Sequence, residues 1–483
     1  MDRRTFVTTG IAAGTALALG KSPLAFTTRK PDEIRVAVAG IRSRGWAHVQ
    51  GLNRLEGVRV VALCDVDRGI LENRQRELAE QGTETQIFRD FRDVLTRDDI
   101  DVVSIATPNH WHAMQTVWAC AAGKDVYVEK PVSHNVREGR LMVEAAKRHG
   151  RIVQAGTQSR SSSAIREAIA WMHEGHIGKP LLARGLCYKP RTSIGKVDGP
   201  RDIPKGVDYD LWTGPAPMKP LRRRQLHYDW HWDFDTGNGD LGNQGIHQMD
   251  LCRWAMGYDR MPDRVIGYGG RFGYDDDGNT PNTLVSILDY PEAPIIFEVR
   301  GLPSSLAAQK NNWGGSMDRY LGMSIGAAVH CEEGTLLMPN YSSAHIKDRA
   351  GKTIKEWRGA QNHFQNFIDA VRSRDTSALN GSIEDGHLSS ALCHLGNISY
   401  LRGETVSPKQ AASKITWPTT SAADVERVVG HLRANGIDFA SSGIVAGKVL
   451  EMDKDSESFI GDADANVMLF RPGRAEYVFP DEA

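Results

Sequence analysis

Apolar and amphipathic segments alternate along residues 33–155. Six apolar runs predict strands, and most of them lack the polar alternation of a half-exposed strand, as is typical of a parallel sheet covered on both faces. Three intervening segments have helical periodicity. The predicted strands are 33–39, 58–64, 85–88, 101–106, 125–128 and 151–155, and the predicted helices are 46–55, 113–122 and 136–149. This order predicts an α/β domain with helices on both faces of one sheet.

A glycine turn joins the first predicted strand to the first helix. The turn reads Gly40-Ile41-Arg42-Ser43-Arg44-Gly45, and Asp65 ends the second strand. A strand, a glycine turn, a helix, a strand and then an acid about 20 residues on is the order of a dinucleotide-binding unit. Free amides at the helix start hold the pyrophosphate, and the acid binds the ribose hydroxyls. Because the carboxylate of Asp65 repels a 2′-phosphate, we expect NAD, although the nearby Arg68 keeps NADP as a less favoured alternative.

One position departs from the G-x-G-x-x-G pattern, since Arg42 replaces the middle glycine. That glycine normally allows the backbone to approach the pyrophosphate, so we expect a looser approach here. Arg42 and Arg44 are candidates to compensate by binding phosphate oxygens. The alternative is a turn of the same shape that binds no ligand.

Charge and cysteine content exclude several function classes. The formal net charge of the 483 residues is -1. The chain therefore has no excess of positive charge that would predict binding to a nucleic acid or an acidic membrane. The six cysteines include no C-x-x-C pair and lie mostly among apolar residues, which predicts buried thiols. We expect no metal site.

The first 30 residues have the character of a targeting signal. Paired arginines in Arg3-Arg4-Thr5-Phe6-Val7 precede a weakly apolar stretch, residues 10–19, and resemble a twin-arginine export signal. The stretch is too short for a stable membrane span. We therefore expect export of the folded, cofactor-loaded protein, with the periplasm as its destination and no membrane span afterwards. An unprocessed amphiphilic arm is the alternative.

Four features in this order resemble the glucose–fructose oxidoreductase / inositol dehydrogenase / MocA (Gfo/Idh/MocA) family over residues 33–405. They are the glycine turn, the segments 107–112 (TPNHWH) and 129–131 (EKP), and the segment 239–250 (GDLGNQGIHQMD). The resemblance implies an N-terminal Rossmann dinucleotide-binding domain and an α/β domain with a large, mostly antiparallel sheet, with substrate bound between them. We accordingly expect a signal over 1–30, the Rossmann domain over 31–156, the substrate domain over 157–420 and an extension over 421–483. We also expect a homo-oligomer.

The resemblance also implies functional residues. Lys130 matches the active-site lysine, whose ammonium can stabilise charge on a substrate hydroxyl, and Pro131 predicts a cis bond that directs it into the cleft. His247 matches a histidine that takes the hydroxyl proton. Asn243 stands where many members carry an aspartate, and an amide cannot act as a base. A solvated lysine and a packing histidine are the alternatives. The expected cofactor-binding residues are Gly40, Ile41, Arg42, Gly45, Asp65, Thr107, Asn109, His112, Glu129 and Lys130.

The second half contains further strands, helices and a concentration of aromatic residues. We expect strands at 181–188, 285–288 and 295–299, the last two antiparallel, and helices at 363–371, 389–401 and 423–435. Residues 230–234 alternate aromatic and polar side chains, which predicts a strand or an extended loop. Aromatic rings beside polar groups commonly bind sugars, although core packing explains them equally well. The candidate substrate-binding residues are Asn243, Tyr188, Arg191 and Trp230.

These observations predict an NAD-dependent oxidoreductase that acts on a hydroxyl of a sugar, polyol or glycoside and binds its cofactor tightly. Export favours an alternative, a glycosidase or lyase that oxidises its substrate transiently, because free NAD is scarce outside the cytoplasm. A sugar-binding relative without catalysis is the third hypothesis. The dehydrogenase requires the fewest assumptions.

Overall fold

The first sheet contains six parallel strands in the order β3-β2-β1-β4-β5-β6. The structure, a computed structural model, describes residues 33–311, 313–418 and 421–479, so the expected export signal over residues 1–30 lies outside the described residues. The strands are β1 (Ile34–Ala39), β2 (Val58–Cys64), β3 (Gln86–Phe88), β4 (Val102–Ile105), β5 (Asp125–Val128) and β6 (Val153–Ala155). They match the six strands that the apolar runs predict.

Helices cover both faces of this sheet. Val36 and Val38 of β1 pack in one hydrophobic cluster with α2 (Arg44–Asn53), whereas Ala37 and Ala39 pack in another with α5 (Asn109–Ala121). Successive side chains of a strand point to opposite faces, so the continuous apolar run fills both clusters. The remaining helices of this region are α3 (Arg68–Glu80), α4 (Phe91–Leu95) and α6 (Val136–Arg148).

The second sheet is larger and mostly antiparallel, as expected. Its strands run in the order β14-β13-β12-β11-β7-β10-β9-β8-β16-β15, with β17 also paired to β8 and to β18. Only the β7–β10 pair is parallel among the pairs of this sheet in the described residues. The strands are β7 (Pro180–Tyr188), β8 (Arg264–Gly270), β9 (Thr283–Asp289), β10 (Ile295–Arg300), β11 (Ile325–Cys331), β12 (Gly334–Asn340), β13 (Ser343–Asp348), β14 (Thr353–Arg358), β15 (Glu404–Val406), β16 (Ile444–Ala446), β17 (Leu450–Asp453) and β18 (Ser458–Phe459).

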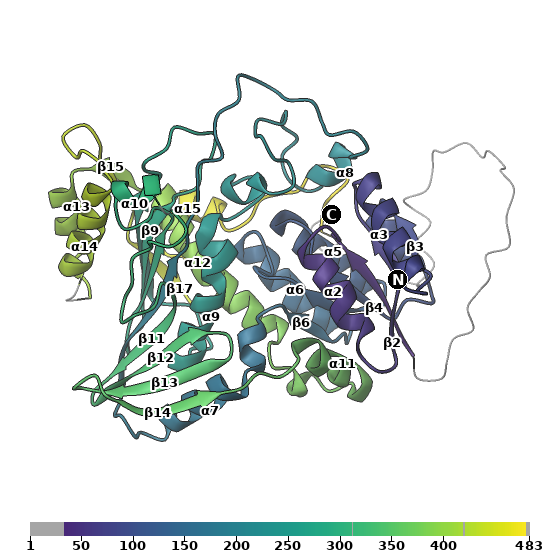
Figure 1. The fold of residues 1–483 in the computed structure, drawn as a ribbon, viewed down its shortest axis with the longest axis horizontal. Coiled ribbons are helices and arrows are strands. Elements are labelled where there is room, and N and C mark those ends of the chain that lie inside the picture. The colour runs from purple at the N-terminus through teal and green to yellow at the C-terminus, as the bar shows by residue number, and fades with distance from the viewer. Residues whose placement is uncertain (1–32, 312, 419–420, 480–483) are drawn as a thin grey trace, which may run out of the picture. The chain divides into compact units, whose positions relative to one another are not determined.

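Two helical layers pack on this second sheet. One contains α7 (Ser163–His173), α9 (Ile246–Met256) and α12 (Ile383–Leu401), and the other contains α14 (Ser421–Ala434). Figure 1 shows α14 and α13 (Pro408–Lys414) beside β15 and α10 (Leu306–Asn311). The segment after residue 420 therefore packs on the sheet and adds the strands β16, β17 and β18.

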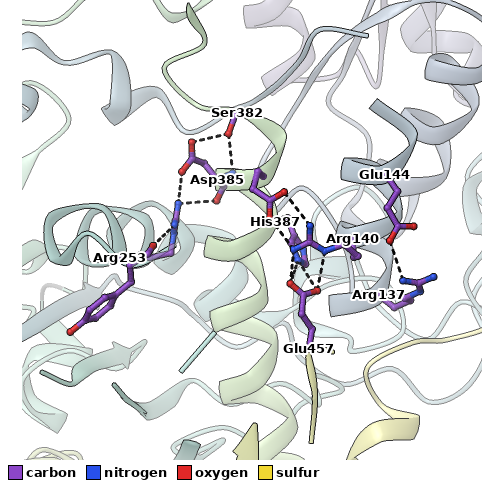
Figure 2. Close-up of polar contacts among 10 residues, drawn as sticks. Arg137, Arg140, Glu144, Arg253, Ser382, Asp385, His387 and Glu457 are labelled. Carbon is purple, nitrogen blue, oxygen red and sulfur yellow. Dashed lines mark hydrogen bonds and ion pairs between the residues drawn. The ribbon is translucent and has the colours of Figure 1, made fainter. Parts of the chain in front are cut away.

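Ion pairs connect the helices of the two sheets (Figure 2). Arg140 on α6 binds Glu384 on α12, at 2.9 Å, and Glu457 in the β17–β18 turn, at 2.6 Å. Nε2 of His387 lies 3.0 Å from the same Glu457 carboxylate. Burial alone would raise the pKa of Glu457, but His387 and Arg140 lower it to about 2. The Glu457 carboxylate is therefore charged at neutral pH and holds α6 and α12 together.

The prediction of a strand or extended loop at residues 230–234 is wrong. Asp229–Trp232 forms a 3-10 turn, because the amides of His231 and Asp233 donate to the carbonyl oxygens of Tyr228 and Trp230, three residues back. The remaining helices are α8 (Tyr209–Thr213), α11 (His363–Ser373) and α15 (Ala463–Val467). All six cysteines are buried free thiols, as predicted. Among the described residues, no helix combines the length and apolar character that crossing a membrane requires.

Candidate active site

The glycine turn presses the start of α2 against the sheet. Gly40 has a φ of +77°, and a Cβ there would lie 2.6 Å from the carbonyl oxygen of Ala106. A Cβ on Gly45 would lie 1.9 Å from the carbonyl oxygen of Gly40. Neither position tolerates a side chain, so this close approach explains both glycines. Ile41 is fully buried and supports the turn from below.

A cavity of about 320 Å³ opens at the carboxyl ends of the first five strands of the Rossmann sheet. This volume lies within the usual range of ligand pockets, and the carboxyl ends of the strands are where ligands bind in sheets of this kind. The cavity is lined by these residues from the sequence-based set: Gly40, Arg42, Asp65, Thr107, Asn109, His112, Glu129, Lys130, Asn243 and Trp230. Ile41, Gly45, His247, Tyr188 and Arg191 do not line it.

Asp65 faces the cavity from the end of β2. Its carboxylate accepts hydrogen bonds from the backbone amides of Ile41, at 3.0 Å, and Asp67, at 3.1 Å. Burial raises the pKa of Asp65 to about 6. Arg68 does not line the cavity; its exposed guanidinium binds Glu72 at 2.6 Å.

The helices that follow β1 and β4 lack side-chain caps. Neither Ser43 before α2 nor Pro108 before α5 gives a side-chain hydrogen bond to the helix start, whereas Asp67 caps α3 and Asn135 caps α6. Uncapped amides at a helix start are donors that attract anions. The donor set at the cavity therefore fits the pyrophosphate of a dinucleotide.

Glu129 is the centre of a buried polar cluster. Its Oε1 accepts from Nε of Arg44 at 2.7 Å, from Nε2 of His48 at 3.1 Å and from Nε2 of Gln158 at 3.2 Å. Burial alone would raise the pKa of Glu129, but Arg44, His48 and Lys130 together hold it well below its usual range. Of the two arginines predicted to bind phosphate, Arg44 thus pairs with the Glu129 carboxylate. Arg42 is exposed at the cavity and remains available to bind a phosphate.

His48 is a member of this cluster that the sequence did not reveal. Burial lowers its pKa, so the ring is neutral; Nε2–H donates to Glu129, and Nδ1 accepts from the Ser104 hydroxyl at 2.9 Å. The three side chains come from α2, β4 and the end of β5. No local spacing connects them, because Glu129 lies 81 residues from His48.

Lys130 reaches across the cavity to the second region of the chain. The Lys130–Pro131 bond is cis, as expected, and Nζ donates to the carbonyl oxygen of Asn243 at 2.9 Å. Burial lowers the pKa of Lys130, and the Glu129 charge opposes this shift. The contact uses the backbone of Asn243, so it does not depend on the side chain at that position.

His247 lies on α9 behind the cavity wall. A π-helical turn, Leu241–Gly245, precedes α9, so Asn243 and His247 do not lie on one continuous α-helix. The His247 ring centroid lies 5.0 Å from that of Tyr341, and Nδ1 is buried without a partner in the described part of the chain. Burial, together with the Lys130 charge, lowers the pKa of His247 well below its usual range, so the imidazole is neutral.

The segment 107–112 connects both halves of the chain. The hydroxyl of Thr107 donates to Gln115 at 2.8 Å, and Nδ2 of Asn109 donates to Oδ1 of Asn238 at 2.9 Å. The two ring nitrogens of His112 lie 2.7 Å from the carbonyl oxygens of Pro131 and Thr107. These contacts hold the start of α5 beside the Lys130 turn.

Two candidate substrate residues point away from the cavity. The Tyr188 hydroxyl donates to Glu298 at 2.6 Å, and its ring packs in a separate cluster against β11 and β12. Side chains alternate along β7, which places Tyr188 on the face of the sheet opposite α9. Arg191 forms a bidentate pair with Asp240 at 2.8 and 2.7 Å, which occupies its guanidinium.

The wall opposite the first sheet comes from residues 206–231. The amide of Arg68 donates to Gly206 at 3.1 Å, and the amide of Asp208 donates to Val66 at 3.1 Å. Nε2 of His227 lies 3.0 Å from the Asp67 carboxylate. The side chains of this wall that line the cavity are Leu211, Trp212, His227, Tyr228, Trp230 and His231. The aromatic residues of this wall belong to the concentration of aromatic residues seen in the sequence, whereas His227 and His231 are not among the predicted site residues.

Comparison with known proteins assigns the two regions. Residues 34–157 match an oxidoreductase family with an NAD-binding Rossmann fold, and residues 176–267 match the C-terminal alpha/beta domain of the same family. Over these residues the chain is similar to the Gfo/Idh/MocA oxidoreductase family. The match agrees with the resemblance carried by the glycine turn and by the segments around Lys130 and His247.

Two curated proteins similar to part of this chain are both named as glycosyl hydrolases. Glycosyl hydrolase family 109 protein 2 of Shewanella sp. (strain ANA-3) is 34% identical over 167 residues, which cover 30% of this chain and 37% of that protein. The glycosyl hydrolase family 109 protein of Shewanella baltica (strain OS155 / ATCC BAA-1091) is 35% identical over 134 residues, which cover 27% and 29%. The chain thus spans 37% and 29% of the length of these two relatives.

Solved structures share the fold. A levoglucosan dehydrogenase in complex with NADH and levoglucosan has a TM-score of 0.55 at 18% identity, covering 75% of this chain and 96% of that one. The WlbA dehydrogenase of Bordetella pertussis, in complex with NADH and UDP-GlcNAcA, has a TM-score of 0.53 at 18% identity, covering 74% and 94%. At this identity the similarity establishes the fold alone.

Proposed function

We propose that this protein is an NAD-dependent enzyme of the Gfo/Idh/MocA family that oxidises a hydroxyl of a sugar, polyol or glycoside and keeps its cofactor bound. The observation that carries the proposal is the position of Lys130. Its half-buried ammonium lines the cavity at the end of β5, beside Glu129 and 2.9 Å from the Asn243 carbonyl oxygen. Named complexes of proteins with this fold contain NADH and sugar-like molecules, which supports the same class of substrate.

The cofactor would be held by the uncapped starts of α2 and α5 and by Asp65, with Arg42 beside the phosphates. When bound, NAD supplies the acceptor for the hydride of the oxidised carbon. The Asp65 carboxylate would bind the ribose hydroxyls and exclude a 2′-phosphate, which favours NAD over NADP. Thr107, Asn109, His112 and Glu129 would line the nicotinamide side.

Lys130 and His247 would carry the proton chemistry. The Lys130 ammonium would donate a hydrogen bond to the substrate oxygen and stabilise its developing negative charge. His247 would accept the hydroxyl proton, since burial keeps its imidazole neutral. Asn243 would orient the substrate, because its side chain lines the cavity but cannot carry a proton.

A second candidate is a glycosidase or lyase that oxidises its substrate only transiently. The similarity to glycosyl hydrolase family 109 proteins favours it, although the match covers 30% of this chain. Our proposal that the protein is exported to the periplasm by the twin-arginine route also favours it, because a closed cycle consumes no external NAD. We propose in addition that the protein forms a homo-oligomer.

The deciding experiment follows cofactor and product together. The purified protein is denatured to assay released nicotinamide, and native protein is incubated with sugars, polyols and aryl glycosides while bound-cofactor absorbance and product release are recorded. Stoichiometric NADH with added NAD identifies the dehydrogenase. Aglycone release without net NADH identifies the glycosidase. Folded protein that contains no nucleotide and binds no added NAD refutes both.

A further inference from the structure

His231 lies on the cavity wall at the proposed substrate side and is not among the predicted functional residues. His231 belongs to the 3-10 turn Asp229–Trp232 and lines the same cavity as Lys130 and Asn243. The charge of Lys130, which also lines the cavity, acts on its ring, as do the charges of Arg191 and Asp240, which do not line it. His231 comes from a different element than His247, which lies on α9 behind the wall.

The proton of His231 has a defined position. Nδ1 lies 2.7 Å from the carbonyl oxygen of Tyr228. A carbonyl oxygen can only accept, so Nδ1 carries the hydrogen and Nε2 of the neutral ring is left with a lone pair. Nε2 makes no hydrogen bond within the described residues. It is also accessible, because it is absent from the buried polar atoms that lack a partner there. It is therefore open to a ligand.

Neighbouring rings hold the imidazole in place. The Trp230 ring stacks on it with centroids 3.7 Å apart and planes at 20°, and the Tyr228 and Trp232 rings lie at 5.0 and 5.9 Å. Trp230 is buried, and its carbonyl accepts a hydrogen bond from Thr236 at 2.9 Å. An acceptor fixed in this way loses little entropy when it binds a ligand.

The ring is uncharged over the physiological range. Burial lowers the pKa of His231 to about 3; the Tyr228 carbonyl and Asp240 favour the protonated form, while Lys130 and Arg191 oppose it. Nε2 consequently remains an acceptor when the cavity is empty of sugar. The role considered for this nitrogen is hydrogen bonding, with no proton transfer.

We propose that Nε2 of His231 accepts a hydrogen bond from one hydroxyl of the substrate, while Lys130 donates to the oxygen of a neighbouring hydroxyl. The proposal rests on the proposed function and specifies its substrate class as sugars or polyols with two neighbouring free hydroxyls. Nε2 can only accept, so a substrate whose hydroxyl at that position is removed or methylated leaves Nε2 without its hydrogen bond. Sites built to bind a hydroxyl discriminate strongly against such analogues.

Chemical labelling tests the accessible nitrogen without any substrate. Diethyl pyrocarbonate modifies neutral, accessible imidazoles, so at pH 6 it should label His231 in the folded protein, with the exposed His176 as an internal reference for reactivity. Peptide mass spectrometry measures both sites. Sugars with adjacent hydroxyls that the enzyme oxidises should protect His231 and leave His176 unchanged. A His231 that stays unlabelled in the folded protein, or that no oxidised sugar protects, overturns the proposal.

Kinetics of matched variants test the hydrogen bond itself. His231→Phe keeps a flat ring but removes the lone pair, His231→Gln restores an acceptor, and His176→Phe is the control outside the cavity. With the oxidised sugar, His231→Phe should lose about 10- to 100-fold in kcat/KM, mainly through KM, which is the size expected for one hydrogen bond to a buried partner. His231→Gln should recover part of this loss, and His176→Phe should lose nothing. NAD content after denaturation should be equal in all variants.

An analogue separates His231 from a general loss of structure. Among the mono-deoxy analogues that keep the oxidised hydroxyl, the one most impaired with the natural enzyme should show no further loss on His231→Phe. Equal losses for parent and analogue would overturn the proposal. If the natural enzyme binds NAD but oxidises no sugar of the panel, the proposed function fails. The labelling experiment, with the same sugars as ligands, then decides whether His231 binds a sugar hydroxyl.

Discussion

Replacing Gly40 with alanine should destabilise the protein and release its cofactor. Gly40 has a φ of +77°, which costs an alanine about 1–2 kcal/mol anywhere in a chain. The added Cβ would also lie 2.6 Å from the Ala106 oxygen and 2.7 Å from the Thr107 nitrogen. These are backbone atoms, which cannot rotate away. Overpacking of this kind costs about 1–3 kcal/mol, so the total loss is about 2–5 kcal/mol.

Gly123 offers a matched control for this substitution. Its φ is also +77°, but no atom lies within 4 Å of a Cβ built there. Gly123→Ala should therefore lose only the conformational part, about 1–2 kcal/mol. The difference between the two variants isolates the contact between the glycine turn and the Ala106–Thr107 backbone.

Two measurements check the reasoning. Urea unfolding with and without added NAD gives the free energy of unfolding, and nucleotide released on denaturation gives the bound NAD. Gly40→Ala should lose most of its NAD, because the start of α2 must move to relieve the contact, while Gly123→Ala should keep it. If Gly40→Ala unfolds at the same urea concentration as Gly123→Ala and retains NAD, the turn is not held as argued.

Further changes test the chemistry of the cavity. Lys130→Met should lower turnover by about 10²–10⁴-fold with NAD content unchanged, and retained turnover would remove the lysine from the reaction. Asn243→Asp keeps the backbone contact to Lys130 but adds a carboxylate nearby, so the pKa of Lys130 should rise and the alkaline limb of the pH–rate profile should move to higher pH. Glu129→Gln should destabilise the protein at pH 7, and the deficit should shrink below about pH 4, because the lowered pKa of Glu129 gives stability that is lost as that carboxylate is protonated. A deficit unchanged with pH in urea unfolding would contradict this sign. Asp65→Asn should weaken NAD and relatively strengthen NADP in a fluorescence titration, and an unchanged ratio would show that Asp65 does not select the cofactor.

Sequence alone predicted those features that depend on neighbours along the chain. Continuous apolar runs such as Val102–Ile105 identify strands covered on both faces, because each residue of such a strand meets a core. Gly40, Gly45 and Asp65 could be found by spacing, since one strand–turn–helix unit places them. Lys130 followed from the family resemblance of its short segment. The fold class is confirmed on this basis, and the roles of these residues remain proposals.

Tertiary structure decided the groups that meet from distant segments. Glu129 lies 85 residues from Arg44 and 29 from Gln158, and no period in the sequence indicates that one carboxylate oxygen binds both. The aromatic alternation around Trp230 predicted a strand or an extended loop, but the segment forms a 3-10 turn, and His231 lines the cavity. An alternation of side-chain types over five residues does not determine the backbone conformation. Here packing against Rossmann residues more than 100 positions away determines which side chains face the ligand.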